Sequence, residues 1–503
     1  MNQKYISTRG GQQNISASQA IISGLAADGG LFVPSFIHEK SIDLSAITDM
    51  NYSDLACEIF NLFLDDFSED QIRHCVTQAY ETGLFEGNAP VAVHRAADRY
   101  FLELYHGPTC AFKDMALTIL PHFMTTAMRI QNIRREVVIL TATSGDTGKA
   151  ALSGFADVPD IDIIVYYPKD GVSTIQEKQM LTQTGQNTCV VGVDGNFDDT
   201  QNGVKRIFSD AAFNRALQAK GFQLSSANSI NIGRLLPQVI YYFYSYGELL
   251  KRGAIALGDA VNFVVPTGNF GDILAGYYAS LIGLPVGRLI CASNANRVLT
   301  DFFRTGSYNR NRPFYKTMSP SMDILISSNL ERLLYDLSDD TDFIASQMQA
   351  LSTNGIYTIP QAIRDKIDAR FWGGCADEKD TASAIKAMFR GQGYLMDPHT
   401  AVASRVYDNY RLTTGDTTPA VVLSTASPYK FAHHVYESIF GRIPADMNDF
   451  AVLDALADQT GVPIPAPLAG LESRPNQHNH VCTKSDMSDA LAAFLSRLSE
   501  NAQ

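Results

Sequence analysis

Residues 137–150 read Val137-Val138-Ile139-Leu140-Thr141-Ala142-Thr143-Ser144-Gly145-Asp146-Thr147-Gly148-Lys149-Ala150. The apolar start predicts a buried strand, and the small and hydroxyl residues after it predict a turn that opens a helix. Backbone amides at such a helix start can bind an anion, although a plain capped turn fits the same residues. The stretch is not a P-loop, because only two residues separate Gly145 from Gly148, where that motif has four.

The same alternation of strands and helices continues on both sides of this stretch. The apolar patterns predict strands at 100–105, 161–167, 189–193, 261–265, 288–292 and 420–423, and helices within 52–81, 198–219 and 232–252. Short apolar strands separated by helices are typical of parallel sheets with right-handed crossovers. We therefore expect an α/β fold with two α/β domains and mainly parallel sheets, followed by a proline-rich loop over 462–480.

Bulk composition narrows the class of protein. The 503 residues carry a formal charge of −13, which argues against nucleic acid or an anionic membrane as partner. No run approaches the ~20 apolar residues of a spanning helix, and residues 1–9 lack the apolar core of a signal peptide. The seven cysteines form no CxxC pair, and the ten histidines form no zinc-ligand pattern. We expect a cytoplasmic protein without a metal.

Two further strand ends and one helix start carry candidate binding residues. Ligands of parallel sheets bind at the carboxyl ends of the strands. After 261–265 come Gly268, Asn269, Phe270, Gly271 and Asp272, which suit a phosphate-binding turn. After 420–423 come hydroxyls that include Ser424 and Thr425. A helix start at 226–234 gathers Asn228, Ser229, Asn231 and Arg234, whose donors suit an oxyanion. Each of these has a plainer interpretation as a glycine turn or a helix cap.

Lys113 stands in the stretch Tyr105-His106-Gly107-Pro108-Thr109-Cys110-Ala111-Phe112-Lys113-Asp114. Most lysines are solvated surface charges, so the residue taken singly is either such a charge or a nucleophile. Two anion-suited turns elsewhere in the chain favour the second interpretation, with a phosphorylated cofactor and an anionic substrate.

Together these blocks, in this order, resemble the threonine synthase family of pyridoxal-phosphate enzymes, and the resemblance runs from residues 5–10 to 424–431. It implies the tryptophan synthase β-like fold, also called fold type II, and the conversion of O-phosphohomoserine and water to threonine and phosphate. The rival interpretations are a phospho-lyase that releases 2-oxobutyrate, an amino-acid dehydratase or sulfhydrylase of the same fold, and a catalytically inactive binding protein.

The resemblance also implies a role for each block. Lys113 would carry the pyridoxal phosphate and act as the catalytic base. The phosphate of the cofactor would lie on the amides of Gly268–Gly271, in the block that includes Asn269, Phe270 and Asp272. Thr425, in preference to Ser424, would meet the ring nitrogen. The substrate carboxylate would bind at Thr143, Ser144, Gly145, Asp146 and Thr147, and the substrate phosphate at Asn228, Ser229, Asn231 and Arg234.

Two departures from the family pattern stand out. Relatives commonly have His-Pro-Ala-Lys-Phe where this chain has Ser427-Pro428-Tyr429-Lys430-Phe431, and the wider fold often has Asn at the position of Asp146. We predict three segments: an N-terminal extension at 1–95, a subdomain at 96–255 with the lysine and the carboxylate loop, and a phosphate-binding subdomain at 256–503. We also expect a monomer or homodimer.

Overall fold

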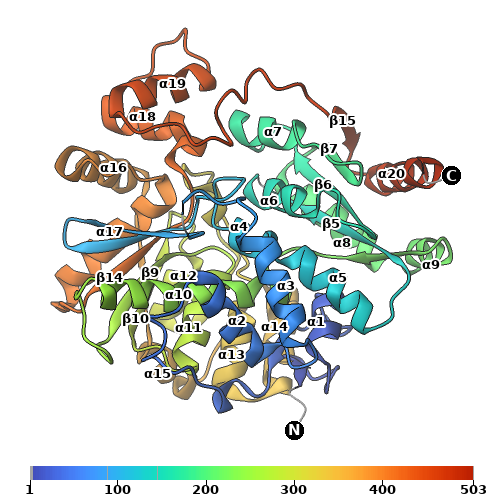
Figure 1. Ribbon diagram of the computed structural model, residues 1–503, viewed down its shortest axis with the longest axis horizontal. Helices are drawn as coiled ribbons and strands as arrows, with labels where there is room; N and C mark the ends of the chain where they lie inside the picture. Colours follow the sequence, from blue (N-terminus) through green and yellow to red (C-terminus); the bar gives the residue numbers. More distant parts are fainter. Residues whose placement is uncertain (1–3, 88, 144, 502–503) are drawn as a thin grey trace.

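Two largely parallel sheets organise the computed structural model, which describes residues 4–87, 89–143 and 145–501 (Figure 1). The six-stranded sheet has, in spatial order, β13 (Phe371–Cys375), β10 (Val286–Ser293), β9 (Val261–Pro266), β14 (Ala420–Ser424), β4 (Arg99–Glu103) and β3 (Ala92–Ala96). Only its β3–β4 pair is antiparallel. The five-stranded sheet is parallel throughout, in the order β15 (His480–Thr483), β7 (Thr188–Asp194), β6 (Ile161–Pro168), β5 (Glu136–Ala142) and β8 (Phe222–Ser225).

The predicted α/β class with mainly parallel sheets is confirmed. Each predicted strand coincides with an observed one, except that the strand predicted at 100–105 ends earlier, at Glu103 of β4. Every residue of β6 and β9 is buried, as continuous apolar runs predict for strands covered on both faces. The predicted helix at 198–219 is divided into α8 (Phe197–Ser209) and α9 (Ala211–Ala219). Asp210 causes the break, because it ends α8 and its carboxylate accepts from the amides of Ala212 and Phe213 as the cap of α9.

Helices cover both faces of each sheet. The inner faces share one core with α2 (Tyr52–Phe63), α3 (Glu69–Tyr80), α5 (Leu120–Ile130), α10 (Ile232–Lys251) and α11 (Gly271–Leu281). The outer face of the six-stranded sheet packs on α16 (Glu378–Gln392), α17 (Pro398–Thr414), α18 (Ala432–Phe440) and α19 (Asp449–Thr460). The outer face of the five-stranded sheet packs on α8, α9 and α20 (Met487–Asn501).

The sheets cut across the three predicted segments. Strand β4 belongs by sequence to 96–255 but pairs with β14 in the six-stranded sheet. Strand β15 belongs to 256–503 but pairs with β7 in the five-stranded sheet. The chain between α19 and β15 therefore crosses from one sheet to the other, over α7 (Thr174–Leu181) (Figure 1). The division into three segments stays a prediction, and the two sheets are not confined to single segments.

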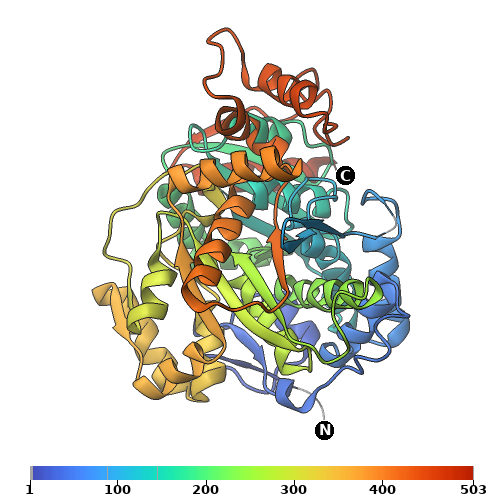
Figure 2. The same cartoon turned by 90° about the vertical axis from the view of Figure 1, so that its left-hand side faces the viewer.

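Further helices and strands complete the fold, and Figure 2 shows the blue N-terminal segment at the opposite end of the molecule from the red C-terminal one. They are β1 (Tyr5–Ser7), α1 (Ala17–Ser23), β2 (Phe32–Pro34), α12 (Val298–Thr305), β11 (Ser307–Asn309), α13 (Leu330–Ser338), α14 (Thr341–Asn354), β12 (Ile356–Thr358) and α15 (Gln361–Asp368). Strands β1 and β2 pair antiparallel, as do β11 and β12.

Arg332 of α13 joins the N-terminal segment to the chain that precedes α10. Its guanidinium is fully buried and donates to the carbonyl of Phe32 at 3.0 Å and to that of Ile230 at 2.6 Å. A third donor bonds Asn329. Because Ile230 lies among the predicted substrate-phosphate residues, the N-terminal segment braces that part of the chain.

Replacing Arg332 by methionine is expected to destabilise the protein strongly. The change leaves two buried carbonyls without a donor, which costs on the order of 3 kcal/mol. The midpoint of urea unfolding should fall well below that of the wild type, whereas Arg215→Met, at an exposed position of α9, should leave it nearly unchanged. Equal midpoints for the two variants would show that Arg332 is no brace.

Candidate functional site

The turn that carries Lys113 is bound to the turn that carries Thr425. Strand β4 leads into the first turn and β14 into the second, and the two strands are parallel neighbours. The amide of Phe112 donates to the carbonyl of Thr425 at 2.8 Å, and the amide of Ser427 donates to that of Cys110 at 3.0 Å. These bonds make the two turns one rigid unit, so Lys113 and Thr425 are held at the same sheet edge.

Asp114 shapes the lysine turn from within. Its carboxylate accepts from the amide of Thr109 at 2.8 Å and from the hydroxyl of Thr109 at 2.5 Å. Gly107 lies so close that an added Cβ would stand 2.6 Å from this carboxylate, so only glycine fits there. The spacing of Gly107, Thr109 and Asp114 therefore has a local structural cause. It also fixes where the helix α4 (Asp114–Leu117) begins, immediately after Lys113.

Lys113 lies beside an aromatic ring and among charged groups of both signs. Its Nζ lies 4.7 Å from the centre of the Phe112 ring and 3.8 Å from Oδ2 of Asp146. Burial lowers the pKa of Lys113; Asp146 opposes this effect, and Lys430 adds to it. The amine is therefore easier to deprotonate than a lysine in water, which suits a nucleophile or a base.

Asp146 is the centre of the charge network. It opens α6 (Asp146–Phe155) and accepts from Nζ of Lys430 at 2.8 Å and from Nε2 of Gln176 at 2.8 Å. Burial alone would raise the pKa of this carboxyl, but Lys430 and Lys113 outweigh burial and hold the pKa well below its usual range. Asp146 is therefore ionised, and in this state it accepts hydrogen bonds and donates none.

The other predicted carboxylate-binding residues surround the start of α6. The hydroxyl of Thr143 accepts from the amides of Gly145 and Gly148, at 3.0 and 2.8 Å, so it stabilises the turn itself. Gly145 has a φ of 132°, which disfavours any residue with a side chain. Thr147 is half-buried in the first turn of the helix. Ser144 lies outside the described residues.

The turn after β9 has the form of an anion site. Phe270 has a left-handed φ of 64°, and no side chain in the described part of the chain caps α11, so the amides of its first turn remain available. A Cβ on Gly268 would stand 2.6 Å from the carbonyl oxygen of Ser321, so a glycine is required there. The carbonyls of Gly268 and Asn269 are turned away and bonded to Ser327 and Asn329, respectively.

Asp272 fastens this helix start to α10. The hydroxyls of Tyr241 and Tyr242 donate to its Oδ1 at 2.6 and 2.9 Å, and burial raises its pKa to about 6. Its Oδ2 is buried without a hydrogen-bond partner in the described part of the chain. Asp272 therefore fixes the position of the anion-binding turn relative to α10.

The start of α10 separates the four predicted phosphate ligands into two kinds. Asn231 is a helix cap: its Oδ1 accepts from the amide of Gly233 at 2.9 Å, and its Nδ2 donates to the carbonyl of Ile21 at 2.8 Å. The side chain is fully buried and has no spare donor aimed at a ligand. Asn228 and Ser229 are half-buried, and Ser229 lies beside Gly271 of the anion turn.

Arg234 is the ligand-like member of the group. It is buried, yet its Nε has no hydrogen-bond partner within residues 4–87, 89–143 and 145–501, and no carboxylate of those residues pairs with it. Nη1 donates to the carbonyl of Ala227 at 2.5 Å, the one hydrogen bond of this guanidinium found among the described residues. Burial lowers the pKa of Arg234 to about 10, so the guanidinium stays charged at neutral pH. A buried, unpaired cation of this kind is expected where an anion binds.

A polar chain links the two sheets behind these residues, and sequence reasoning did not find it. Ser321 donates from its hydroxyl to Asp146 at 3.3 Å and from its amide to Nε2 of His399 at 3.1 Å. Nδ1 of His399 bonds Asp397 at 2.7 Å, and Asp397 accepts from Thr400. Because Nε2 accepts, the proton of the imidazole is on Nδ1.

This chain of bonds ends at β14 and bears on the choice between Ser424 and Thr425. The hydroxyl of Ser424 lies 3.0 Å from that of Thr400, so it is engaged inside the fold. The predicted preference for Thr425 agrees with this arrangement. The sequence analysis assigned no role to Lys430, although Lys430 belongs to the family segment at 427–431. Gln176, Ser321 and His399 belong to no motif of the sequence.

Comparison with known proteins identifies the family of this chain. Family models match at residues 4–80 (Threonine synthase N terminus), 84–425 (Pyridoxal-phosphate dependent enzyme) and 400–491 (Threonine synthase, C-terminal). The threonine synthase of Schizosaccharomyces pombe is 37% identical over 458 residues, which cover 85% of this chain and 87% of that protein. This chain belongs to the threonine synthase family.

The solved structure of PLP-bound threonine synthase from Brucella melitensis has the same fold, with a TM-score of 0.85, 35% identity and coverage of 98% and 99% of the two chains. The predicted type II fold of pyridoxal-phosphate enzymes is confirmed. Threonine synthase-like 1 from Pongo abelii is 38% identical over 459 residues, 87% of this chain, and the chain spans 61% of the length of that relative.

Family membership makes pyridoxal phosphate the cofactor, and the residues present fit that group. The uncapped start of α11 suits its phosphate, and the partly buried Lys113, with its lowered pKa, suits its aldehyde. Ionised Asp146 differs from the amide of the wider fold, because it cannot donate to the phenolic oxygen. Lys430, which lies 2.8 Å from Asp146, is the buried donor beside that carboxylate.

Replacing Lys430 by methionine is expected to slow attachment of pyridoxal phosphate at neutral pH. Lys430 helps to lower the pKa of Lys113, so its removal raises that pKa and reduces the neutral amine at a given pH. The pH profile of cofactor uptake, followed by visible absorbance, should shift to higher pH. Lys430→Arg should largely restore it, and identical profiles for the two variants would contradict this role.

Proposed function

We propose that the protein converts O-phospho-L-homoserine and water into L-threonine and phosphate, as a carbon–oxygen lyase of threonine biosynthesis. The observation that carries this proposal is the buried, unpaired guanidinium of Arg234, beside a lysine that suits the cofactor. A substrate with a phosphate at its far end gives Arg234 the anion that its surroundings lack. The named activity of the relatives at 34–37% identity supports the same substrate.

The cofactor residues have separate tasks in this proposal. Lys113 attaches pyridoxal phosphate, the amides of Gly268, Asn269, Phe270 and Gly271 hold its phosphate, and Thr425 meets its ring nitrogen. When bound, pyridoxal phosphate withdraws electrons from the substrate carbon that carries the amine. Asp272 holds the phosphate turn in place through Tyr241 and Tyr242.

The substrate residues come from the starts of two other helices, α6 and α10. The start of α6, residues 143–147, receives the substrate carboxylate, and Asn228, Ser229 and Arg234 receive its phosphate. Nζ of Lys113 then takes and returns protons at the substrate carbons, which its lowered pKa favours at neutral pH. Asp146 stays ionised throughout, and it balances the positive charge of Lys113 and Lys430.

The second candidate function is a phospho-lyase that releases 2-oxobutyrate and ammonia from the same substrate. The same binding residues serve both reactions, because the two reactions differ only in whether water adds to the bound intermediate before the product leaves.

We propose in addition that the protein acts in the cytoplasm as a monomer or homodimer. Within the described residues no helix is long and apolar enough to cross a membrane.

The role of Lys113 is tested by its replacement with alanine. The purified protein with pyridoxal phosphate should absorb visible light, and it should form threonine and phosphate from O-phosphohomoserine. Lys113→Ala should lose both properties, while Lys178→Ala, on α7, should keep them. Release of 2-oxobutyrate and ammonia in place of threonine would favour the phospho-lyase, and a wild type that stays colourless would overturn both.

The role of Arg234 is tested by its replacement with methionine. Loss of a charged hydrogen bond to the substrate phosphate should lower kcat/KM about 10- to 100-fold, mainly through KM. Inhibition by inorganic phosphate should weaken in parallel. Arg252→Met, at the opposite end of α10, is the matched control and should change neither quantity. An unchanged KM for Arg234→Met would place the substrate phosphate elsewhere.

A further inference from the structure

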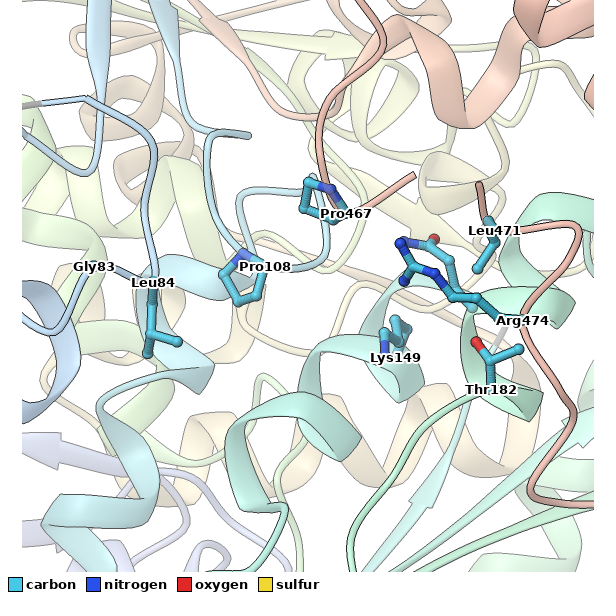
Figure 3. A pocket seen from close by; sticks show the side chains of 9 residues that line it. Gly83, Leu84, Pro108, Lys149, Thr182, Pro467, Leu471 and Arg474 are labelled. Carbon is cyan, nitrogen blue, oxygen red and sulfur yellow. The ribbon is translucent and has the colours of Figure 1, made fainter. Parts of the chain in front are cut away.

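A cavity lies beside the lysine turn, and its lining residues are not among those assigned above. It has a volume of about 320 Å³. Its walls come from α6, α7, the turns at 83–84 and 108, and the crossing segment between α19 and β15 (Figure 3). The lining residues are Gly83, Leu84, Pro108, Lys149, Gln179, Thr182, Pro467, Leu471 and Arg474.

Two cations face this space. Figure 3 shows the side chain of Arg474, from the crossing segment, next to that of Lys149, from α6. None of the described lining residues is acidic. Nζ of Lys149 bonds the neutral amide oxygen of Gln183, which leaves donors free on the ammonium. Burial lowers the pKa of Lys149 to about 8, and Lys430 and Arg474 contribute to this effect. A bound anion would relieve this repulsion.

Gln179 adds an acceptor to the same wall. Its side chain is 2% exposed, and its Oε1 has no hydrogen-bond partner among the described residues. Its Nε2 points to the carbonyl of Thr109, at 3.5 Å, so the amide oxygen is left for another donor. A buried acceptor without a partner costs free energy, and a hydroxyl or ammonium group of a ligand would satisfy it.

The crossing segment forms a fixed wall. The amides of Gln477 and His478 donate to the carbonyl of Leu181, at 2.7 and 3.2 Å, and the ring of His478 contacts the carbonyl of Gln183 at 3.0 Å. These bonds tie the segment to the end of α7, near Lys149. The cavity is therefore a built feature of the fold.

We propose that this cavity binds a small organic anion that carries a hydroxyl or ammonium group, separately from the catalytic residues. Lys149 and Arg474 bind the phosphate or carboxylate of the ligand, and Oε1 of Gln179 accepts from its hydroxyl or ammonium. A volume of about 320 Å³ fits a metabolite of a few carbon atoms, at the small end of ligand sites. This proposal does not depend on which reaction the protein catalyses.

The site is tested by calorimetric titration of the cofactor-loaded protein with glycerol 3-phosphate and with sulfate. Arg474→Gln should weaken the binding of both probes about tenfold. Arg442→Gln removes an exposed cation that does not line the cavity, so it should not affect either probe. Gln179→Met should weaken glycerol 3-phosphate while sulfate, which has no hydroxyl, binds as before.

The catalytic residues provide an internal distinction. If a probe binds at Arg234, Arg474→Gln should not weaken that binding. Binding that Arg474→Gln weakens is therefore binding in the cavity. Turnover of Arg474→Gln should equal that of the wild type. Equal titrations for Arg474→Gln and Arg442→Gln would overturn the proposal, and equal loss of both probes in Gln179→Met would overturn the role of the amide.

Discussion

The carboxylate of Asp146 between two lysines is the interaction on which the site depends. Lys113 follows β4, Asp146 follows β5, and Lys430 follows β14, so three strands of two sheets deliver one charge cluster. In a buried setting, removing one member leaves an uncompensated charge, which is far more costly than at the surface. The position of one sheet relative to the other therefore affects the charge state of Lys113, because it sets the distance between Lys113 and Asp146.

The cluster is not neutral. Lys113, Lys430 and Arg234 are buried cations near one another, and Asp146 is the carboxylate that contacts the two lysines. The unpaired Nε of Arg234 shows where the charge balance is incomplete. A phosphorylated cofactor and a phosphorylated substrate both bring negative charge to such a place. Under the proposed function, these ligands would balance the excess positive charge. The overall charge of −13 therefore does not exclude a locally positive site.

The candidate site was predictable to the extent that it follows local rules. Gly268, Gly145 and the strands before them follow from turn and burial patterns, because backbone geometry restricts those positions to few residue types. Asn231 is the instructive exception. Asparagine at a helix start suits a ligand and a cap equally well, and only the contacts with Gly233 and Ile21 assign it to the cap.

The sequence alone determined the alternation of buried strands and helices, the glycine-bearing turns after those strands, and the family to which their order belongs. These are properties of short segments, each set by periodicity and backbone sterics. Only the tertiary structure decided that Lys430, Ser321 and His399 join Asp146, and that residues near 470 return to α7. Such contacts join residues up to hundreds of positions apart, and no local pattern encodes which distant partner a buried polar group will find.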